Sequence, residues 1–342
     1  MPEATQWLSV LVPAYNAAPF VAECLGSILS QWQPGVELVV IDDGSTDSTR
    51  AVVTEVARRH PGRVTLARHE HNQGLSVTRN ELIRAANGEY VWFIDADDLL
   101  IAGAIRGLRP IVNRHAPDLV LCDYLRTSTN RVRRGSSFAG PSRTIISDTS
   151  TILAALFEAG QLHPWSKISR RALWSEPLEF PHGRVFEDVT VMPRLACRAS
   201  TVYHEPEPWV SYRKWAGSIV ATMNPRKCID LVRASAEFPA AVQRRGLRLS
   251  DRALFASRHY AARHFIRAMR HLAEWHEQDA SRHARGECLA LFEEAIEGQS
   301  AWLMRRYLQR GWLYRGAQLR YWMSRAARES SAVRMDGERA VA

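Results

Sequence analysis

The chain is predicted to fold as an α/β protein with a mostly parallel central sheet flanked by helices, followed by a C-terminal helical region. Three observations predict this fold. Short apolar runs alternate with helical patterns through the first 120 residues, the run at Tyr90–Ile94 is apolar throughout, and no strand pattern follows Pro225. Such alternation builds a parallel sheet with right-handed crossovers, whose strands are covered on both faces.

The elements are expected in this order. Strands are predicted at 8–12, 36–41, 64–67, 90–94 and 118–124, and helices at 20–31, 45–59, 76–86 and 102–115. Gly44 permits the turn after the second strand, and Ser45 or Thr46 can cap the helix that follows. Residues 126–143, rich in Ser, Thr, Arg and Gly, are expected to form a surface loop or an irregular hairpin.

Charge is distributed unevenly along the 342 residues. The formal net charge is +9, yet residues 1–120 carry 10 arginines against 14 acids. The basic surface therefore belongs to the second part of the chain.

Cysteines and hydropathy place the protein in the cytoplasm. The five cysteines are scattered and form no Cys-x-x-Cys pair, which argues against a disulfide framework and against a zinc site. No apolar run approaches the roughly 18 residues that a membrane span needs, and no signal peptide pattern opens the chain. We therefore expect reduced thiols in a cytoplasmic protein.

Three acids directly follow the strand at Tyr90–Ile94. In open α/β sheets ligands bind at the carboxyl ends of strands, so Asp95, Asp97 and Asp98 would stand at the mouth of the sheet. If the strand continued, Asp95 and Asp97 would point the same way and could share a hard divalent ion that also holds phosphate oxygens. The alternative is a polar turn in which Asp98 caps the next helix.

Two common nucleotide sites are missing. The loop after the first strand reads Pro13-Ala14-Tyr15-Asn16-Ala17-Ala18-Pro19, without the glycines of a dinucleotide fold, and no Gly-x-x-x-x-Gly-Lys-Ser/Thr motif occurs. A nicotinamide dehydrogenase and a P-loop enzyme are therefore disfavoured.

Four blocks along the first hundred residues resemble the family-2 glycosyltransferases, which have the GT-A fold. The blocks are SVLVPAYN, ELVVIDDGSTDST, HNQGLSVTRN and GEYVWFIDADD. The resemblance implies donor contacts from five residues and metal contacts from two of the acids. Pro13 and Tyr15 would line the nucleotide, Asp43 would accept a hydrogen bond from the base, Arg79 would lie near the donor, Asp95 would reach the ribose and diphosphate, and Asp97 with Asp95 would hold Mn²⁺ or Mg²⁺.

Three later blocks resemble bacterial surface-polysaccharide members of the same family. They are 163–171 with Trp165 and Lys167, 186–189 with Glu187 and Asp188, and 212–218 with Arg213 and Ser218. The resemblance implies that Asp188 is the catalytic base, with Glu187 as the near alternative, and that Trp165 and Lys167 lie near the acceptor. Arg213 and Ser218, beside Gly217, would close over the diphosphate. The Gln-x-x-Arg-Trp signature of processive members is missing, which favours single addition.

The expected function is accordingly a metal-dependent, inverting transfer of one sugar from a nucleotide-sugar, with a UDP-sugar as the expected donor, to a saccharide or lipid-linked acceptor in cell-surface polysaccharide synthesis. A sugar-phosphate nucleotidyltransferase and an inactive scaffold subunit are the alternatives. Residues 1–118 would form the nucleotide-sugar half of the GT-A domain and 119–222 the acceptor half. Residues 223–329 would form the helical region and 330–342 a disordered tail.

The segment Ala301–Arg328 combines seven arginines and six Trp or Tyr residues with no acid. This composition indicates either a helix lying on an anionic membrane or one that packs on the catalytic domain. Its apolar stripe is imperfect, because Arg315 falls on it and Gly311 and Gly316 interrupt it. Nucleic acid is not an expected partner, since no recognition fold accompanies these residues.

Overall fold

The computed structural model describes residues 6–128, 131–175, 178–214 and 223–341, and within these it leaves the side chains of 278 and 330–341 undescribed. The chain forms two compact units. The sheet unit comprises Met1–Gly183 and Val191–Ala216, and the helical unit comprises Arg184–Thr190 and Gly217–Ala342. The expected halves 1–118 and 119–222 both contribute strands to one sheet.

The sheet has ten strands in the order β3-β2-β1-β4-β9-β6-β10-β5, with β7 on β6 and β8 on β10. The first four strands are parallel, and β9 runs antiparallel between β4 and β6. The strands are β1 Leu8–Ala14, β2 Val36–Asp42, β3 Val64–Arg68, β4 Tyr90–Phe93, β5 Leu99–Leu100, β6 Leu119–Ser128, β7 Arg131–Gly135, β8 Ile145–Ile146, β9 Lys167–Arg170 and β10 Val202–Arg213.

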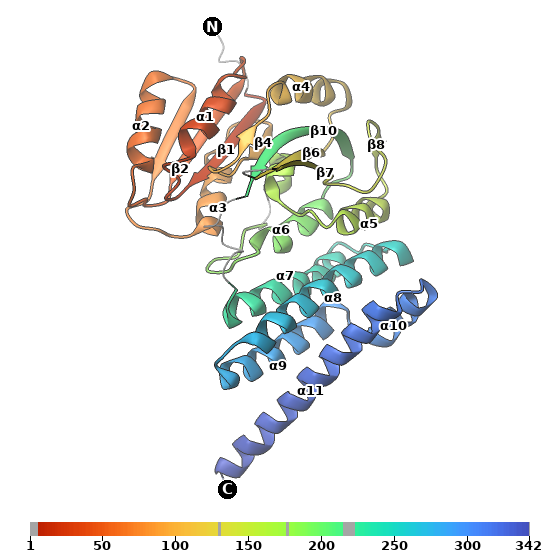
Figure 1. Ribbon diagram of the computed structural model, residues 1–342. Helices are drawn as coiled ribbons and strands as arrows, with labels where there is room; N and C mark the ends of the chain where they lie inside the picture. Colours follow the sequence, from red (N-terminus) through yellow and green to blue (C-terminus); the bar gives the residue numbers. More distant parts are fainter. Residues whose placement is uncertain (1–5, 129–130, 176–177, 215–222, 342) are drawn as a thin grey trace. The chain divides into compact units, whose positions relative to one another are not determined.

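The helices of the sheet unit lie on both faces of the sheet (Figure 1). The chain moves from β1 to β2 and β3 in one direction and then returns to β4 on the other side of β1. Because crossovers are right-handed, α1 and α2 cover one face and α3 the other. These helices are α1 Val21–Leu29, α2 Thr49–Arg59, α3 Leu75–Ala85, α4 Ala104–His115, α5 Thr149–Ala159 and α6 Glu187–Ala196, with 3-10 turns at Pro164–Ser166 and Arg171–Trp174.

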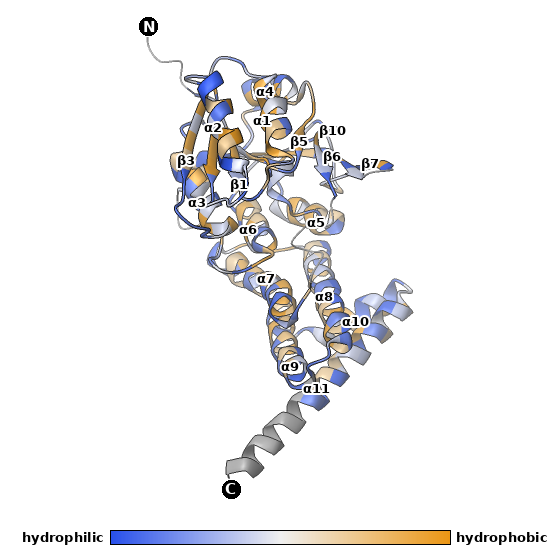
Figure 2. Cartoon of the chain, turned by 60° about the vertical axis from the view of Figure 1, so that its left-hand side comes forward, coloured by the Kyte–Doolittle hydropathy of each residue, from blue (hydrophilic) through white to orange (hydrophobic). Residues whose placement is uncertain are grey.

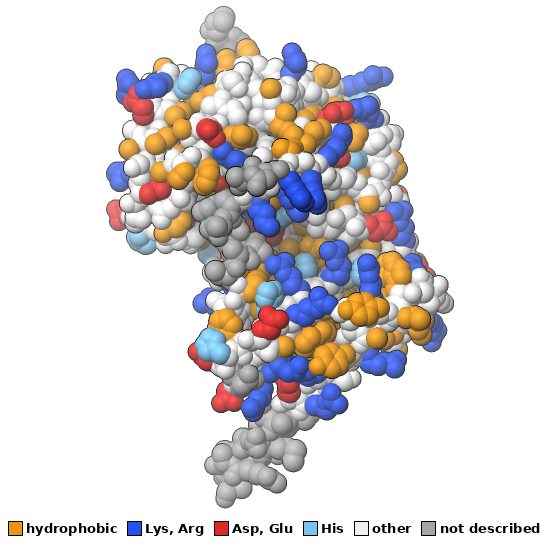
Figure 3. All heavy atoms as spheres, viewed as in Figure 1, with side chains coloured by type: hydrophobic (Ala, Val, Ile, Leu, Met, Phe, Trp, Pro, Cys, Tyr) orange, Lys and Arg blue, Asp and Glu red, His pale blue; other side chains and the backbone are white. Residues whose placement is uncertain are grey.

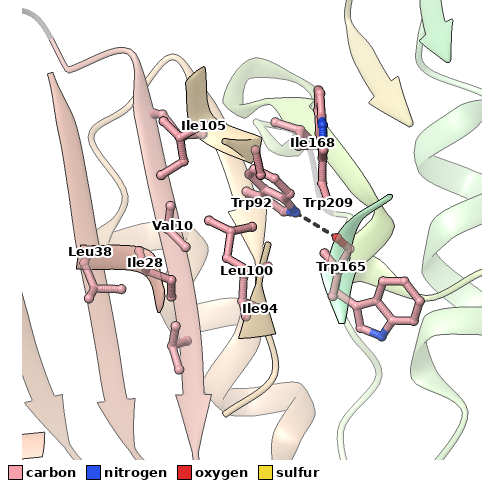
Figure 4. Close-up of a cluster of buried hydrophobic side chains, with 14 of the residues drawn as sticks. Val10, Ile28, Leu38, Trp92, Ile94, Leu100, Ile105, Trp165, Ile168 and Trp209 are labelled. Atoms are coloured by element: carbon pink, nitrogen blue, oxygen red, sulfur yellow. Dashed lines mark hydrogen bonds between the residues drawn. The ribbon is translucent and has the colours of Figure 1, made fainter. Parts of the chain in front are cut away.

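The core of the sheet unit is built from the apolar runs that predicted the strands. Val10, Trp92 and Ile168 are fully buried, and the indole Nε1 of Trp92 donates a hydrogen bond of 2.7 Å to the carbonyl oxygen of Trp165 (Figure 4). This bond joins β4 to the turn before β9. It fixes the second half of the sheet to the first half inside a dry core, where a lost bond costs most.

The helical unit contains α7 Pro225–Arg244, α8 Asp251–Glu274, α9 Gln278–Ala295, α10 Ser300–Gln309 and α11 Leu313–Val341. Asn224 and Ser250 cap α7 and α8 by accepting hydrogen bonds from backbone N–H groups three residues ahead. The interior is apolar, with Phe265 of α8 stacked on Phe292 of α9 at 4.6 Å between ring centroids. Hydrophobic and hydrophilic residues alternate along these helices (Figure 2), as helices with one buried face require.

Two local elements differ from expectation, and one expectation stays untested. Leu99–Leu100 form strand β5 rather than the start of a helix, and α4 begins only at Ala104. Strands β9 and β10 occupy stretches for which no strand was predicted. Helix α11 continues to Val341 through residues expected to form a disordered tail; no side chain is described there beyond Glu329, so disorder of 330–342 remains a prediction.

Candidate active site

The candidate site lies where the strand order reverses, at the carboxyl ends of β1 and β4. Ile94 N donates to Leu11 O at 3.0 Å, so the chain leaves both strands side by side. An open α/β sheet binds its ligands at such a switch point. After β4 the residues Asp95, Asp97 and Asp98, here called the acid turn, form a turn closed by a hydrogen bond of 2.9 Å from Asp98 N to Asp95 O.

The metal prediction assumed that β4 continues through Asp95 and Asp97, and this turn shows that it does not. β4 ends at Phe93, so the side chains of Asp95 and Asp97 are not placed by strand alternation. The alternative reading is also wrong in one respect, because Asp98 is followed by β5 and caps no helix. The structure thus keeps the acids together in a polar turn, as the alternative expected, but without the helix that Asp98 was to cap.

Asp98 is the buried member of the acid turn. Its side chain has no exposed surface, Oδ1 accepts the backbone N–H of Arg213 at 2.8 Å, and Oδ2 has no hydrogen-bond partner in the described part of the chain. Burial, followed by the charges of Asp95 and Asp97, raises the pKa of Asp98 well above its usual value. Burial and the two neighbouring acids therefore disfavour a charge on Asp98.

Arg79 is directed at the acid turn from α3. Its Nη2 donates to Asp95 Oδ1 at 2.8 Å, and its guanidinium is buried against the rings of Phe93 and Phe180 at 5.9 and 5.4 Å. From the sequence motif alone, Arg79 was expected to lie near the donor. The structure brings Arg79 and Asp95 together, so Arg79 orients the carboxylate that the donor would meet.

Arg213 ends β10 and also contacts the acid turn. Its Nε donates to the carbonyl oxygen of Asp97, and its Nη1 lies 2.5 Å from Glu23 Oε2 on α1. The guanidinium lies over the ring of Phe20 at 5.0 Å. Arg213 is thus held between α1 and the acid turn, and its expected role over the diphosphate remains a prediction. Ser218, expected beside it, lies outside the described residues.

Asp43 holds the loop that precedes α3. Its two oxygens accept four hydrogen bonds, from the ring of His69 at 2.6 Å, the amide side chain of Asn72 at 3.1 Å, and the backbone N–H groups of Gln73 and Gly74 at 2.8 and 2.9 Å. A carboxylate offers about four such positions. A contact from Asp43 to a base, which remains a prediction, would therefore require one of these donors to move.

His69 is a site residue that the sequence did not single out. Its ring bridges two acids, with Nδ1 2.6 Å from Asp43 Oδ1 and Nε2 2.8 Å from Glu81 Oε2. Burial lowers the pKa of His69, but the hydrogen bonds that its ring donates to Asp43 and Glu81 outweigh burial and leave that pKa raised. Protonated His69 therefore ties the Asp43 loop to α3.

We predict a pH-dependent contribution of His69 to stability. A raised pKa in the folded state stabilises the fold fully below the usual histidine pKa of about 6.5, and this stabilisation is lost as the pH rises through the raised value. The melting temperature of His69→Gln should fall furthest below wild type near pH 6 and approach it in alkali. His283→Gln, at an exposed position of α9, is the control. Parallel pH profiles for wild type and His69→Gln would refute the assignment.

Pro13 and Tyr15 stand at the end of β1. Pro13 is buried in the strand, whereas the ring of Tyr15 is 47% exposed. The next residue, Asn16, has a positive φ of 46° and is fixed by hydrogen bonds to Ser45 and Thr46 in the loop after β2. An aromatic ring held in solvent at the switch point can stack on a flat ligand such as a nucleobase.

Lys167 and Trp165 are buried beside the loop that precedes β9. The ammonium of Lys167 is buried and donates to the carbonyl oxygens of Gln161 and His163 and to the hydroxyl of Ser166. Three donors on three partners use the full capacity of the group. Trp165 is also buried, so both residues fix the 161–166 loop, and an acceptor contact from either remains a prediction.

Two aromatic residues beside Trp165 were quoted in the sequence motifs without a role. His163 and Tyr212 lie with their rings nearly parallel to that of Trp165, at centroid distances of 5.0 and 5.6 Å. Burial, followed by the charges of the acid turn, raises the pKa of Tyr212, which shows that this ring group adjoins the acids. Rings grouped in this way offer a surface for a sugar.

Glu187 and Asp188 belong to the helical unit. They open α6, directly after Phe186, whose φ of 62° is strained for a residue with a side chain. One oxygen of Asp188 accepts the backbone N–H of Val189 at 2.8 Å. Asp188 therefore contacts the backbone within the first turn of α6, and its role as the base remains a prediction.

Helices α7 and α8 anchor this segment. Asp230 of α7 accepts the backbone N–H of Val185 at 3.3 Å, and Glu237 pairs with Arg184 at 2.6 Å. The Asp188 charge also reaches Tyr260 on α8, whose pKa is raised by burial first and by Asp188 second. The helical unit therefore positions the residue expected to be the base.

A metal ion fits the acid turn only in part. Among the described residues, no group of three or more His, Cys, Asp or Glu side chains is arranged to hold a metal ion. The unpartnered Asp98 Oδ2 and the acids that raise the pKa of Asp98 nevertheless favour a nearby positive charge. Asp95 and Asp97 could supply two oxygen ligands to Mg²⁺ or Mn²⁺, with phosphate and water completing the set.

Comparison with known proteins agrees with this geometry. Residues 9–173 match the family described as glycosyl transferase family 2. The sequence resemblance and the expected fold are thereby confirmed. No helix in the described part of the chain has the length and apolar character of a membrane span.

Similar proteins come from bacteria. The glycosyltransferase GlyG of Streptococcus pneumoniae is 27% identical over 64% of this chain and 74% of its own length. The uncharacterised glycosyltransferase EpsJ of Bacillus subtilis is 33% identical, but the match covers only 36% of each chain. The crystal structure of S. aureus TarS 1-349 in complex with UDP-GlcNAc aligns with a TM-score of 0.71 at 22% identity, over 93% of this chain and 90% of that chain. This last likeness concerns the fold.

Proposed function

We propose that the protein transfers one sugar from a nucleotide-sugar to an acceptor hydroxyl with inversion, in the synthesis of a cell-surface polysaccharide or glycoconjugate. The observation that carries the proposal is the placement of three acids after β4 and of the exposed Tyr15 after β1, at the switch point of the sheet and within residues that match glycosyl transferase family 2. A UDP-sugar is the proposed donor, because TarS, whose fold this chain shares, was solved with UDP-GlcNAc.

The donor would bind across the ends of β1 and β4. Tyr15 would stack on the base, while Asp95, oriented by Arg79, would face the ribose and diphosphate. A bound Mn²⁺ or Mg²⁺, held by Asp97 and Asp95, would supply positive charge that offsets the diphosphate. Arg213, already beside Asp97, would add a second positive charge as the leaving group departs.

The acceptor would be activated by a carboxylate at the start of α6. Direct displacement at the anomeric carbon needs a carboxylate that takes the acceptor proton as the new bond forms. Asp188 is the proposed base, because α7 and α8 hold its segment and because the N-terminus of α6 favours its ionised form. The ring group of His163, Trp165 and Tyr212 would support the acceptor sugar. The acceptor is proposed to be a saccharide or a lipid-linked saccharide on the cytoplasmic side of the membrane.

A screen of nucleotide-sugars tests this function directly. The purified protein with Mn²⁺ is incubated with a panel of nucleotide-sugars, and release of the nucleoside diphosphate is measured. We expect slow donor hydrolysis with a UDP-sugar and faster release once an acceptor is supplied. Formation of pyrophosphate from a nucleoside triphosphate and a sugar phosphate would favour the nucleotidyltransferase. Donor binding without any turnover would favour the scaffold subunit.

A further inference from the structure

The segment Ala301–Arg328 is divided between two helices that pack on the helical unit. Gly311, with a φ of 68°, separates α10 from α11, which explains why one continuous apolar stripe did not fit. Leu303, Tyr307 and Leu319 point into the core formed with α8 and α9 and are fully buried. The segment is therefore an integral part of the helical unit, and only its outer face can meet a partner.

The outer face exposes unusually large apolar side chains. Leu308, Leu313, Tyr314 and Tyr321 are 60%, 63%, 73% and 52% exposed, and they are four of the six large hydrophobic residues exposed in the described part of the chain. Tyr314 and Tyr321 are seven residues apart, which is two turns, so they lie on the same side of α11. Exposed apolar groups gathered on one face mark an interaction site.

Four exposed arginines of this segment have no carboxylate partner in the described part of the chain. They are Arg305, Arg310, Arg315 and Arg320. The segment itself contains no acid. By contrast, Arg306 pairs with Asp251, and Arg325 pairs with Glu329. In the view of Figure 3, arginine and lysine side chains of the helical unit lie among hydrophobic ones.

Two of the unpaired arginines are held in place by rings. Arg310 lies over the ring of Phe255 at 3.8 Å, and Arg315 lies over that of Trp312 at 4.3 Å. Arg315 Nη1 is 3.1 Å from His259 Nε2, and a guanidinium can only donate. His259 accepts this bond because burial and then the neighbouring arginines lower its pKa to about 4. The two guanidinium groups are thus held against rings, and each has more N–H donors than these contacts use.

We infer that this outer face of α10 and α11 binds an anionic phospholipid surface. Unpaired guanidinium groups attract phosphate headgroups, and the flanking Leu313 and Tyr314 can enter the boundary between headgroups and acyl chains. A soluble polyanion would satisfy the arginines but would leave the leucines and tyrosines in water. The inference does not depend on transferase activity, because it concerns a surface remote in sequence from the donor residues, and its test measures binding alone.

Vesicle flotation tests the inference with the full-length protein. Wild type should float with phosphatidylcholine vesicles that contain phosphatidylglycerol, should stay behind with pure phosphatidylcholine, and should dissociate as salt is raised. Replacing Arg305, Arg310, Arg315 and Arg320 together by Gln should lower the partition coefficient about tenfold or more, since each basic residue near such a surface contributes measurably. Leu313→Gln with Tyr314→Ser should also weaken binding.

Two control variants separate a lipid surface from other partners. The first control is the double variant Arg306→Gln and Arg325→Gln, which removes positive charge where the arginines pair with acids. The second control is Val132→Ser, which removes an exposed apolar side chain of β7 in the sheet unit. Both should bind vesicles almost as wild type does. Equal loss in the paired-arginine control would overturn the inference, since net charge alone would then decide binding. Undiminished binding by Leu313→Gln with Tyr314→Ser would also overturn it. So would a dimer in light scattering that the same outer-face variants convert to monomer.

Discussion

Asp188→Asn is expected to lower turnover by about 10²–10⁴-fold, the usual contribution of a positioned general base. Asparagine caps helices well, so α6 and its contact to the N–H of Val189 should persist and the protein should remain folded. Donor affinity should stay near wild type, because the proposed donor contacts come from the sheet unit. Steady-state kinetics with a titration of nucleoside diphosphate separates the two effects.

A second aspartate provides a matched control for this variant. Asp148 caps α5 by accepting the backbone N–H of Thr151 at 2.8 Å, and it is not part of the candidate site. Asp148→Asn should therefore leave turnover unchanged, which shows that a capping contact alone does not account for the loss. Near-normal transfer by Asp188→Asn, together with an inactive Glu187→Gln, would move the base to Glu187.

Asp97→Asn is expected to abolish the metal-dependent part of donor binding. Wild type should bind the nucleoside diphosphate at least tenfold more tightly with Mn²⁺ than after chelation, because two carboxylates beside a diphosphate need a cation between them. The variant should bind weakly under both conditions. Calorimetric titration with and without chelator measures this difference.

An exposed acid controls for the loss of one negative charge. The side chain of Asp279 on α9 is 97% exposed, so Asp279→Asn changes the net charge by the same amount far from the acid turn in sequence. Its donor affinity and metal dependence should match wild type. If chelation leaves the affinity of wild type unchanged, Asp97 has no metal role, and the acid turn must be stabilised by Arg79 and Arg213 alone.

Three of the first four strands could be predicted because their residues are buried on both faces. β1, β2 and β4 are buried along their whole length and are mostly apolar in sequence, whereas β3 is largely exposed. The placement of acids at the end of β4 followed from the same pattern. The family motifs then identified the fold correctly, as the likeness to TarS confirms.

Strands β9 and β10 could not be predicted from such patterns. β10 contains Pro206 and Pro208, and its register shifts between Glu205 and Pro208 and again before Val210, so no regular alternation survives. β9 spans only Lys167–Arg170 and carries charge at both ends. Its lysine is buried because three polar partners satisfy it, which is a tertiary effect.

The contacts of the candidate site depend on tertiary structure in the same way. The motif singled out Asp43, but the backbone N–H groups that donate hydrogen bonds to its carboxylate belong to a loop thirty residues later. Arg213 was expected to be mobile because Gly217 follows it, yet its contacts to Glu23 and Asp97 arise from α1 and the acid turn. Residue types identified the site, whereas the partner of each side chain required the fold.

The anomeric configuration of the transferred sugar tests direct displacement most directly. With the donor found by the screen and a matching acceptor, NMR of the first-formed product gives the configuration from the coupling of the anomeric proton. We predict that it is inverted relative to the donor, because one carboxylate deprotonates the acceptor while the diphosphate leaves from the opposite face. A product that retains the donor's configuration would contradict both the displacement and the assignment of Asp188 as the base.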